Sequence, residues 1–282
     1  MKILVAVDKT KESQVALSYA CHLMEHFIAI VDALYVKPDV VETVTGGGGY
    51  IPFTMRSKVE REIEKETEKT VEEIIEACAI CVGKRIPCNP FVASGDPAEE
   101  ILHFADRDYY DMIIFGSQGR SLLRGLLVET VPAKILQRAQ QSVLVLRKFR
   151  PIEKILVAYR GSQCDPGALE FIAPLFTKKK PEITVLHVQE MGQAESQEFV
   201  EACLRTGEET LRRYGHAPLK KSVKGEFVEE ILKAVAIERH DLLVLAGYEP
   251  ELPKNLKVMS DEVLELVRLT TRPVLVYRED NY

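Results

Sequence analysis

Hydrophobic residues along the chain fall into two kinds of segment that alternate. Short continuous apolar runs are typical of strands buried on both faces of a parallel sheet. Between them, apolar residues recur every three or four positions, which is the period of a helix. In the first half the pattern predicts strands over residues 3–7, 28–36, 90–93, 111–115 and 142–146. It predicts helices from Ser13, as N-cap, to Phe27, and over residues 57–79, 98–106 and 130–139. The long second helix is expected to bury Val59, Ile63, Val71, Ile74 and Ile75.

The second half of the chain repeats the first. ILVAVD at residues 3–8 returns as ILVAYR at 155–160, EEIL at 99–102 returns at 229–232, and SVLVLR at 142–147 returns as PVLVYR at 273–278. The second copy is shorter in its middle, where the first holds the glycine run at residues 46–49, which we expect to form a mobile loop. The repeat predicts two tandem domains, residues 1–150 and 151–282. Each is expected to be a Rossmann-like α/β fold with an open parallel sheet and right-handed crossovers.

Candidate ligand-binding residues follow the strands of the first half. Asp8 ends the first strand, and Gly116 and Gly119 follow the fourth, so their backbone can approach a ligand closely. Arg120 adds positive charge, and a helix is expected to begin near Thr130, where its N-terminus would favour an anion. Ligands of open α/β sheets bind beyond the carboxyl ends of the strands. The pattern therefore predicts a nucleotide site in the first domain.

Both halves resemble the universal stress protein domain. The likeness rests on the ILVAVD opening, the ALYV strand, SGDPAEEIL, DMIIFGSQG and the terminal SVLVLR. It implies that Asp8 and the Val36 backbone hold adenosine, while Gly116, Gly119 and Thr130 line the ribose and phosphates. The ATP-binding branch of that family has Gly-Ser or Gly-Thr nine residues after its G-x-x-G, where this chain has Glu129 before Thr130. The implied ligand is ATP, ADP or AMP, with or without Mg²⁺. Repulsion between the Glu129 carboxylate and a polyphosphate favours AMP or ADP.

The second half departs from these motifs at the same points. Arg160 stands in place of Asp8, and AGYEP at residues 246–250 replaces the glycine turn. Proline removes a backbone donor and glutamate adds negative charge, so we expect no nucleotide in the second domain. Arg160 and His187 are open to two interpretations, another ligand or ordinary packing.

Composition narrows the class of partners. The chain has 282 residues, a formal net charge of −6 and 46% apolar residues. This acidic balance disfavours nucleic acid as a partner, and the lysine run at residues 178–180 is interpreted as a solvated turn. No apolar run reaches the ~20 residues of a membrane helix. We expect a cytoplasmic protein whose six cysteines are reduced, with the C-x-x-C pair Cys78 and Cys81 as buried helix residues.

Three functions remain open at this stage. The favoured hypothesis is a non-enzymatic stress or signalling module that binds an adenine nucleotide; the others are an interaction scaffold without nucleotide and a slow ATPase. Walker, G-x-S-x-G and H-E-x-x-H motifs are absent from the sequence, which weighs against an enzyme. The apolar last strands are expected to pair within the chain as a pseudo-dimer, and two chains can then join through helical faces as a homodimer.

Overall fold

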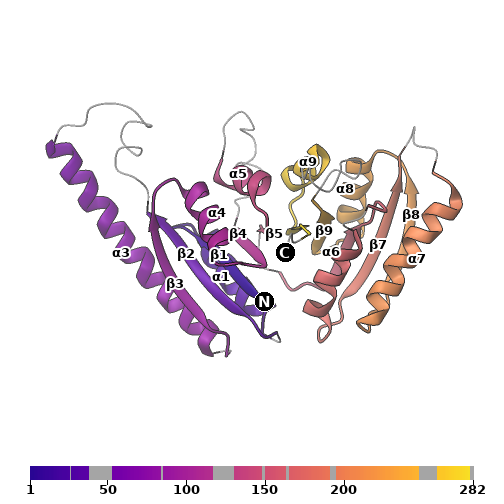
Figure 1. The fold of residues 1–282 in the computed structure, drawn as a ribbon, viewed down its shortest axis with the longest axis horizontal. Coiled ribbons are helices and arrows are strands. Elements are labelled where there is room, and N and C mark those ends of the chain that lie inside the picture. The colour runs from indigo at the N-terminus through magenta and orange to yellow at the C-terminus, as the bar shows by residue number, and fades with distance from the viewer. Residues whose placement is uncertain are drawn as a thin grey trace. The chain divides into compact units, whose positions relative to one another are not determined.

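Figure 1 shows the fold of the chain in a computed structural model. The structure describes residues 1–25, 27–37, 53–83, 85–116, 130–147, 150–162, 165–190, 195–247 and 259–279. These residues form two compact units. Unit 1 comprises the described part of residues 1–116 with residues 130–138, and unit 2 comprises the described residues from 139 onward.

Unit 1 is built on four parallel strands in the order β3-β2-β1-β4. Helices α1 and α3 contact one another on one face of this sheet, and α4 and α5 contact one another on the other. The elements are β1 (Lys2–Val7), α1 (Lys11–Leu23), β2 (Ile30–Lys37), α3 (Phe53–Gly83), β3 (Cys88–Ser94), α4 (Pro97–Arg107), β4 (Met112–Gly116) and α5 (Val131–Arg138).

Unit 2 repeats this plan and adds one strand. Its order is β5-β10-β9-β6-β7-β8, and every neighbouring pair is parallel except β5 with β10. Helices α6 and α7 contact one another, as do α8 and α9. The elements are β5 (Ser142–Leu146), β6 (Lys154–Ala158), α6 (Asp165–Ile172), the 3-10 helix η2 (Ala173–Phe176), β7 (Glu182–Gln189), α7 (Gln197–Arg213), β8 (Leu219–Lys224), α8 (Phe227–Ile237), β9 (Leu242–Ala246), α9 (Asp261–Leu269) and β10 (Val274–Tyr277).

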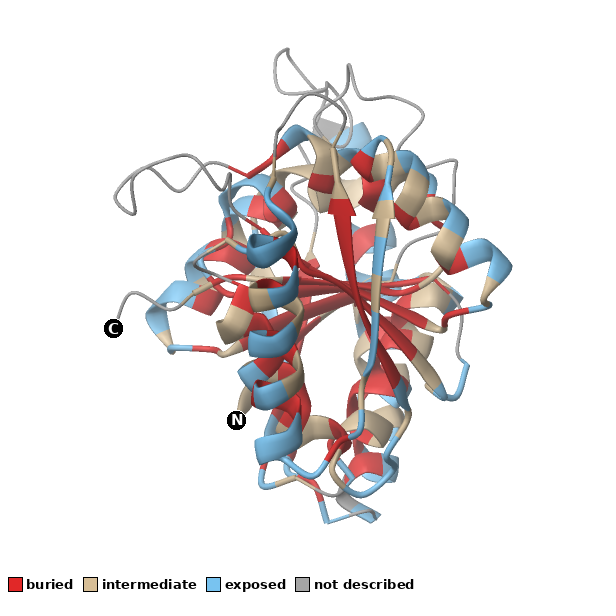
Figure 2. Cartoon of the chain, turned by 90° about the vertical axis from the view of Figure 1, so that its right-hand side faces the viewer, coloured by how far each residue is buried: buried red, intermediate tan, exposed pale blue. Residues whose placement is uncertain are grey.

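The core of each unit lies on its central strands. Ile3, Leu4 and Val5 of β1 are fully buried, and so are Leu243 and Val244 of β9. Helices cover both faces of such a strand, so the sequence can be apolar without interruption. Figure 2 shows the buried residues concentrated on the strands, with exposed residues on the outer faces of the helices.

The last strands of the two repeats form an antiparallel ladder inside unit 2. Leu275 of β10 lies opposite Leu144 of β5, and the main chain of Arg278 donates to the Ser142 hydroxyl at 3.2 Å. This is the pairing that their apolar sequences predict, because an apolar edge left open would invite association with another chain.

Several local predictions need correction. Thr10, and not Ser13, is the N-cap of α1, since its side chain accepts from the main chain of Ser13. Ile28, expected in the second strand, precedes β2 and is 95% exposed. Ile75 is 51% exposed, because it lies one position beyond the buried stripe to which Ile74 and Cys78 belong. The glycine run at residues 46–49 lies outside the described residues.

Candidate functional site

Three neighbouring strands of unit 1 end side by side at the predicted site. Val7 of β1 pairs with Tyr35 of β2, and Ala6 of β1 pairs with Phe115 of β4. The next residues along β1 and β2, Asp8 and Val36, therefore lie opposite each other at the carboxyl edge of the sheet, and Gly116, which follows Phe115, lies one residue earlier, at the level of Val7. Because β1 and β4 lead into helices on opposite faces, this is the switch point of the sheet, where open α/β folds bind ligands.

Asp8 is exposed, and the start of α1 orients it. One oxygen of its carboxylate, Oδ1, accepts from the main-chain N–H of Thr10 at 2.8 Å and from the Thr10 hydroxyl. The Ser13 hydroxyl accepts from the Asp8 N–H at 3.0 Å and donates to the Asp8 carbonyl at 2.6 Å. Ser13 therefore braces the end of β1 from inside the helix, which is why it is buried and does not serve as the cap.

Gly116 is required by a close approach of the protein backbone. A Cβ at this position would lie 2.3 Å from the Glu12 carbonyl oxygen and 2.9 Å from the Ser13 nitrogen. The first turn of α1 thus fills the space that sequence analysis reserved for a ligand. Glycine here sets the distance between α1 and β4.

Thr130 stands directly before α5, on the opposite face of the sheet from α1. Its hydroxyl accepts from the main-chain N–H of Ala133 at 3.4 Å, and its carbonyl accepts from the main-chain N–H of Lys134 at 2.9 Å. The side-chain Nζ of Lys134 lies 3.5 Å from a carboxylate oxygen of Asp96, the N-cap of α4. The pKa of Asp96 is lowered mainly by the hydrogen bond from the Glu99 main-chain N–H, and Lys134 lowers it further. The Asp96 carboxylate therefore already caps α4 and pairs with Lys134, and the N-terminus of α5 is the part of this region that favours a further anion.

The remaining predicted site residues cannot be placed. Gly119, Arg120 and Glu129 lie outside the described residues, between Gly116 and Thr130. The structure thus brings Asp8 and Gly116 to neighbouring strand ends beside Val36, with Thr130 at the start of α5.

The corresponding point of unit 2 is occupied by the chain's own charges. Arg160, in the place of Asp8, lies 2.5 Å from Glu262 and 3.3 Å from Glu190, and its guanidinium stacks over Phe227 at 4.3 Å. Burial raises the pKa of Glu190, and the carboxylates of Glu262, Glu226 and Glu195 raise it further, against the lowering effect of Arg160. The arrangement is a closed ion-pair cluster in an acidic setting.

His187 is held entirely by protein groups. It is fully buried, its Nδ1 lies 2.8 Å from the Tyr159 carbonyl oxygen, and its Nε2 lies 2.8 Å from a Glu195 carboxylate oxygen. Both ring nitrogens are therefore satisfied, which favours the packing interpretation of this residue over a ligand-binding one.

The model of the universal stress protein family matches residues 1–147. A curated relative, the universal stress protein YxiE of Bacillus subtilis, is 32% identical over 148 residues, which are 52% of this chain and 98% of that protein. The chain belongs to the universal stress protein family.

Two solved structures of universal stress proteins share the fold over the whole chain. That of a universal stress protein from Archaeoglobus fulgidus covers 99% of this chain and 97% of its own, with a TM-score of 0.73 at 19% identity. That of a putative universal stress protein from Pseudomonas aeruginosa covers 98% and 92%, with a TM-score of 0.65 at 15% identity. The predicted fold class, an α/β fold built on a mostly parallel sheet, is confirmed.

The structure contains one bond that the sequence did not indicate. Cys21 of α1 and Cys81 of α3 form a disulfide, with their Cα atoms 5.4 Å apart. The prediction that all cysteines are reduced is therefore wrong for this pair. Cys78, Cys88 and Cys203 are buried thiols. Where the structure is described, no group of three His, Cys, Asp or Glu side chains is arranged to hold a metal ion, and no helix is long and apolar enough to cross a membrane.

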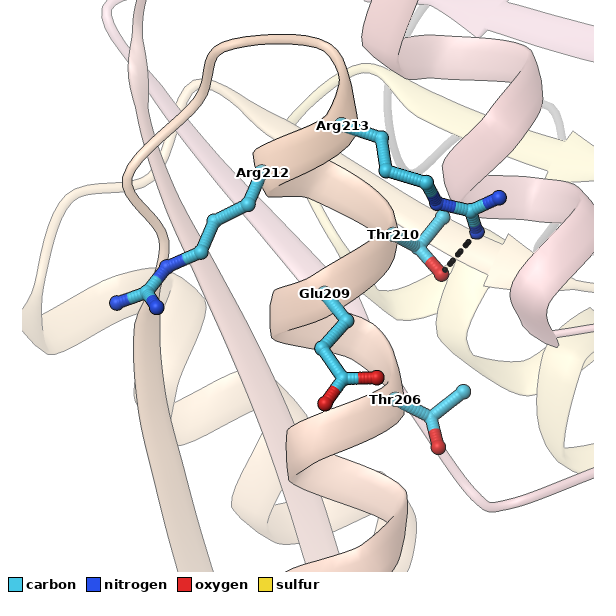
Figure 3. Close-up of a pocket in the computed structure, with 5 residues that line it drawn as sticks. All are labelled: Thr206, Glu209, Thr210, Arg212 and Arg213. Atoms are coloured by element: carbon cyan, nitrogen blue, oxygen red, sulfur yellow. Dashed lines mark hydrogen bonds between the residues drawn. The ribbon is translucent and has the colours of Figure 1, made fainter.

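A separate hollow of about 500 Å³ lies on α7 of unit 2 (Figure 3). Its arginines already have partners, because Arg213 donates to Glu170 at 3.2 Å and Arg212 to Glu208 at 2.6 Å. An anion would have to displace these carboxylates, so the hollow offers no preformed site. It is lined by Thr206, Glu209, Thr210, Arg212 and Arg213.

Proposed function

We propose that this universal stress protein is a regulatory adenine-nucleotide-binding protein of the stress response, that unit 1 holds the nucleotide, and that it is not an enzyme. The observation that carries the proposal is the contrast between the two switch points. In unit 1 an exposed carboxylate, Asp8, stands at the strand ends, whereas in unit 2 the same position holds Arg160 neutralised by two glutamates. A carboxylate at such an edge can accept hydrogen bonds from ribose hydroxyls.

The nucleotide would lie across the strand ends with its phosphates toward α5. Asp8 and the main chain of Val36 would contact the adenosine. Gly116 and Thr130, with Gly119 and Arg120, would line the ribose and phosphates, as the family resemblance implies. Glu129 next to Thr130 carries a negative charge, and two unit charges at ~4 Å repel by about 4 kcal/mol at an effective dielectric near 20. The proposed ligand is therefore AMP or ADP in preference to ATP, with or without Mg²⁺.

Residues 151–282 are proposed to be a second universal stress protein domain that has lost its ligand. Support comes from the carboxylates that surround Arg160, because they would repel phosphate. The nearest of them are those of Glu190 and Glu262. In this proposal the first domain is residues 1–150, the two last strands give an intrachain pseudo-dimer, and two chains can associate as a homodimer. Nucleic acid is not a proposed partner, and the proposed location is the cytoplasm.

Titration calorimetry with AMP, ADP and ATP, each with and without Mg²⁺, tests the proposal. We expect binding near one site per chain, and at least a tenfold loss in Asp8→Ala, which corresponds to about 1.4 kcal/mol or more. The matched control is Glu64→Ala, which removes an exposed carboxylate from α3 and should bind like the parent. No heat with any nucleotide, from protein whose circular dichroism shows it folded, would overturn the proposal and leave an interaction scaffold.

A further inference from the structure

Four cysteines gather at the edge of unit 1 opposite to the nucleotide site. Helices α1 and α3 run against the strands, so both end near the point where the strands begin. Cys21 and Cys81 lie close to these helix ends and are joined by the disulfide. Cys78 lies one turn before Cys81 on α3, and Cys88 is the first residue of β3.

Cys78 and Cys88 are in direct contact, since their side chains form a hydrogen bond. The chain reverses between them, with the Ile86 N–H donating to the Cys81 carbonyl at 3.0 Å and Arg85 in the left-handed region at φ 65°. This reversal brings the start of β3 back against α3. The two thiols are therefore held as a neighbouring pair by the fold itself.

The pair is chemically asymmetric. The hydrogen bond from Cys88 stabilises a thiolate on Cys78 and lowers the pKa of Cys78, against the opposing effects of burial and Asp32. The same hydrogen bond and burial raise the pKa of Cys88. Cys78 is thus the nucleophile of the pair, because the thiolate is the form that attacks disulfides, and Cys88 is the thiol placed to react second.

We propose that Cys78 and Cys88 form a thiol site that a low-molecular-weight disulfide oxidises to a second disulfide, next to Cys21–Cys81. The Cys78 thiolate attacks one sulfur of the small disulfide, forms a mixed disulfide and releases one small thiol. Cys88, after giving up its proton to solvent, attacks the Cys78 sulfur and releases the second small thiol. Two protein thiols are oxidised and one small disulfide is reduced to two thiols, so atoms and electrons balance.

The position of β3 gives the reagent a way in. Cys78 and Cys88 are only 4% and 8% exposed, so the closed structure protects them. Among the described strands, β3 pairs only with β2, and most of its side chains are exposed. Local opening of an edge strand needs far less free energy than unfolding of the unit. Once closed, the second bond would tie β3 to α3, which Cys21–Cys81 already ties to α1.

The test uses the full-length protein and oxidised glutathione. The protein is equilibrated with rising ratios of oxidised to reduced glutathione and quenched with acid. It is then alkylated in denaturant, and the mass of the intact chain is measured by mass spectrometry. Six cysteines with one disulfide leave four thiols to alkylate, and we expect this number to fall to two on oxidation. Peptide mapping without reductant should then find Cys78 linked to Cys88. In Cys88→Ser we expect one glutathione to remain on Cys78.

Controls separate this site from general thiol oxidation. Cys203→Ser removes a buried thiol on α7 and should lower both thiol counts by one without changing the loss of two. The proposal is overturned if Cys78 and Cys88 remain alkylated once Cys21–Cys81 is fully formed. A Cys78–Cys81 link, formed by exchange inside the chain, would overturn it as well. Peptide mapping of the oxidised parent protein tests the proposal even if Cys88→Ser fails to fold. None of these outcomes depends on nucleotide binding.

Discussion

Asp165 and Ser13 occupy equivalent positions in the two repeats and brace the end of the first strand in each. In unit 1 the Ser13 hydroxyl accepts from the Asp8 N–H, and in unit 2 one oxygen of the Asp165 carboxylate accepts from the N–H groups of Arg160 and Ser162, both at 2.8 Å. A carboxylate in this place carries an electrostatic cost that a hydroxyl does not. Asp165 is 2% exposed, and burial raises its pKa to about 6, although the hydrogen bonds from Ser162 and Arg160 oppose this rise.

The raised pKa predicts a stability change with a defined sign. The folded state holds the Asp165 proton more tightly than the unfolded state, whose pKa is near 4. Stability contributed by this group is therefore full below pH 4 and declines until about pH 6. A difference of about two pKa units corresponds to about 3 kcal/mol. In Asp165→Asn this decline should disappear, because the amide oxygen can still accept both N–H groups without a charge.

Urea unfolding between pH 4 and pH 7 measures this effect. Other carboxyl groups titrate in the same range in both proteins, so the quantity to follow is the difference in free energy of unfolding between the parent and Asp165→Asn. As pH rises from 4 to 6, we expect the variant to become more stable relative to the parent. Above pH 6 we expect the difference to stay constant. Two parallel curves would show that Asp165 titrates as an exposed carboxyl group does.

At the scale of elements, the link between α1 and α3 is a tertiary feature that sequence periodicity does not contain. Cys21 and Cys81 are 60 residues apart, and each fits the buried stripe of its own helix as a small apolar residue. Both helices lie on one face of the sheet of unit 1 and contact each other, which brings the two sulfurs together. The pattern predicted that both helices exist and which side of each is buried, apart from Ile75, but it could not tell which buried cysteines would meet.

Reduction of this disulfide is expected to destabilise unit 1. Closing a loop of 60 residues removes chain entropy from the unfolded state that is worth about 4 kcal/mol in the loop-closure model. Urea unfolding with and without a phosphine reductant should show a loss of this size. The double variant Cys21→Ser with Cys81→Ser should be insensitive to reductant. An equal loss in that variant would place the effect elsewhere in the chain.

At the scale of the whole molecule, strand β5 connects the first repeat to the fold of unit 2. Its sequence belongs to the first repeat, yet its described hydrogen-bonded partner in unit 2 is β10, with Val143 opposite Val276 and Val145 opposite Val274. Arg147 extends this connection, because its guanidinium donates to the Val267 carbonyl of α9 at 2.5 Å. A boundary drawn from sequence repeats therefore does not coincide with a boundary drawn from contacts.

A core substitution in β5 should consequently be detected in unit 2. Leu144 is 2% exposed and lies opposite Leu275, so Leu144→Ala is expected to cost about 2–5 kcal/mol. Hydrogen exchange followed by mass spectrometry should show faster exchange in peptides covering β10. Val7→Ala, a truncation in β1 of unit 1, is the matched control and should leave β10 protected. Unchanged exchange in β10 of Leu144→Ala would contradict this account.

The sequence by itself determined the order of strands and helices, the tandem repeat and the family. Each of these depends on local periodicity or on internal similarity, and both can be observed in the sequence without knowledge of the fold. Tertiary structure decided which distant groups meet: Arg160 with Glu190 and Glu262, Cys21 with Cys81, and Leu144 with Leu275. These contacts join residues that are 30 to 131 positions apart, and their energies depend on distance and burial in the folded chain. No pattern within a window of one helix or strand carries that information.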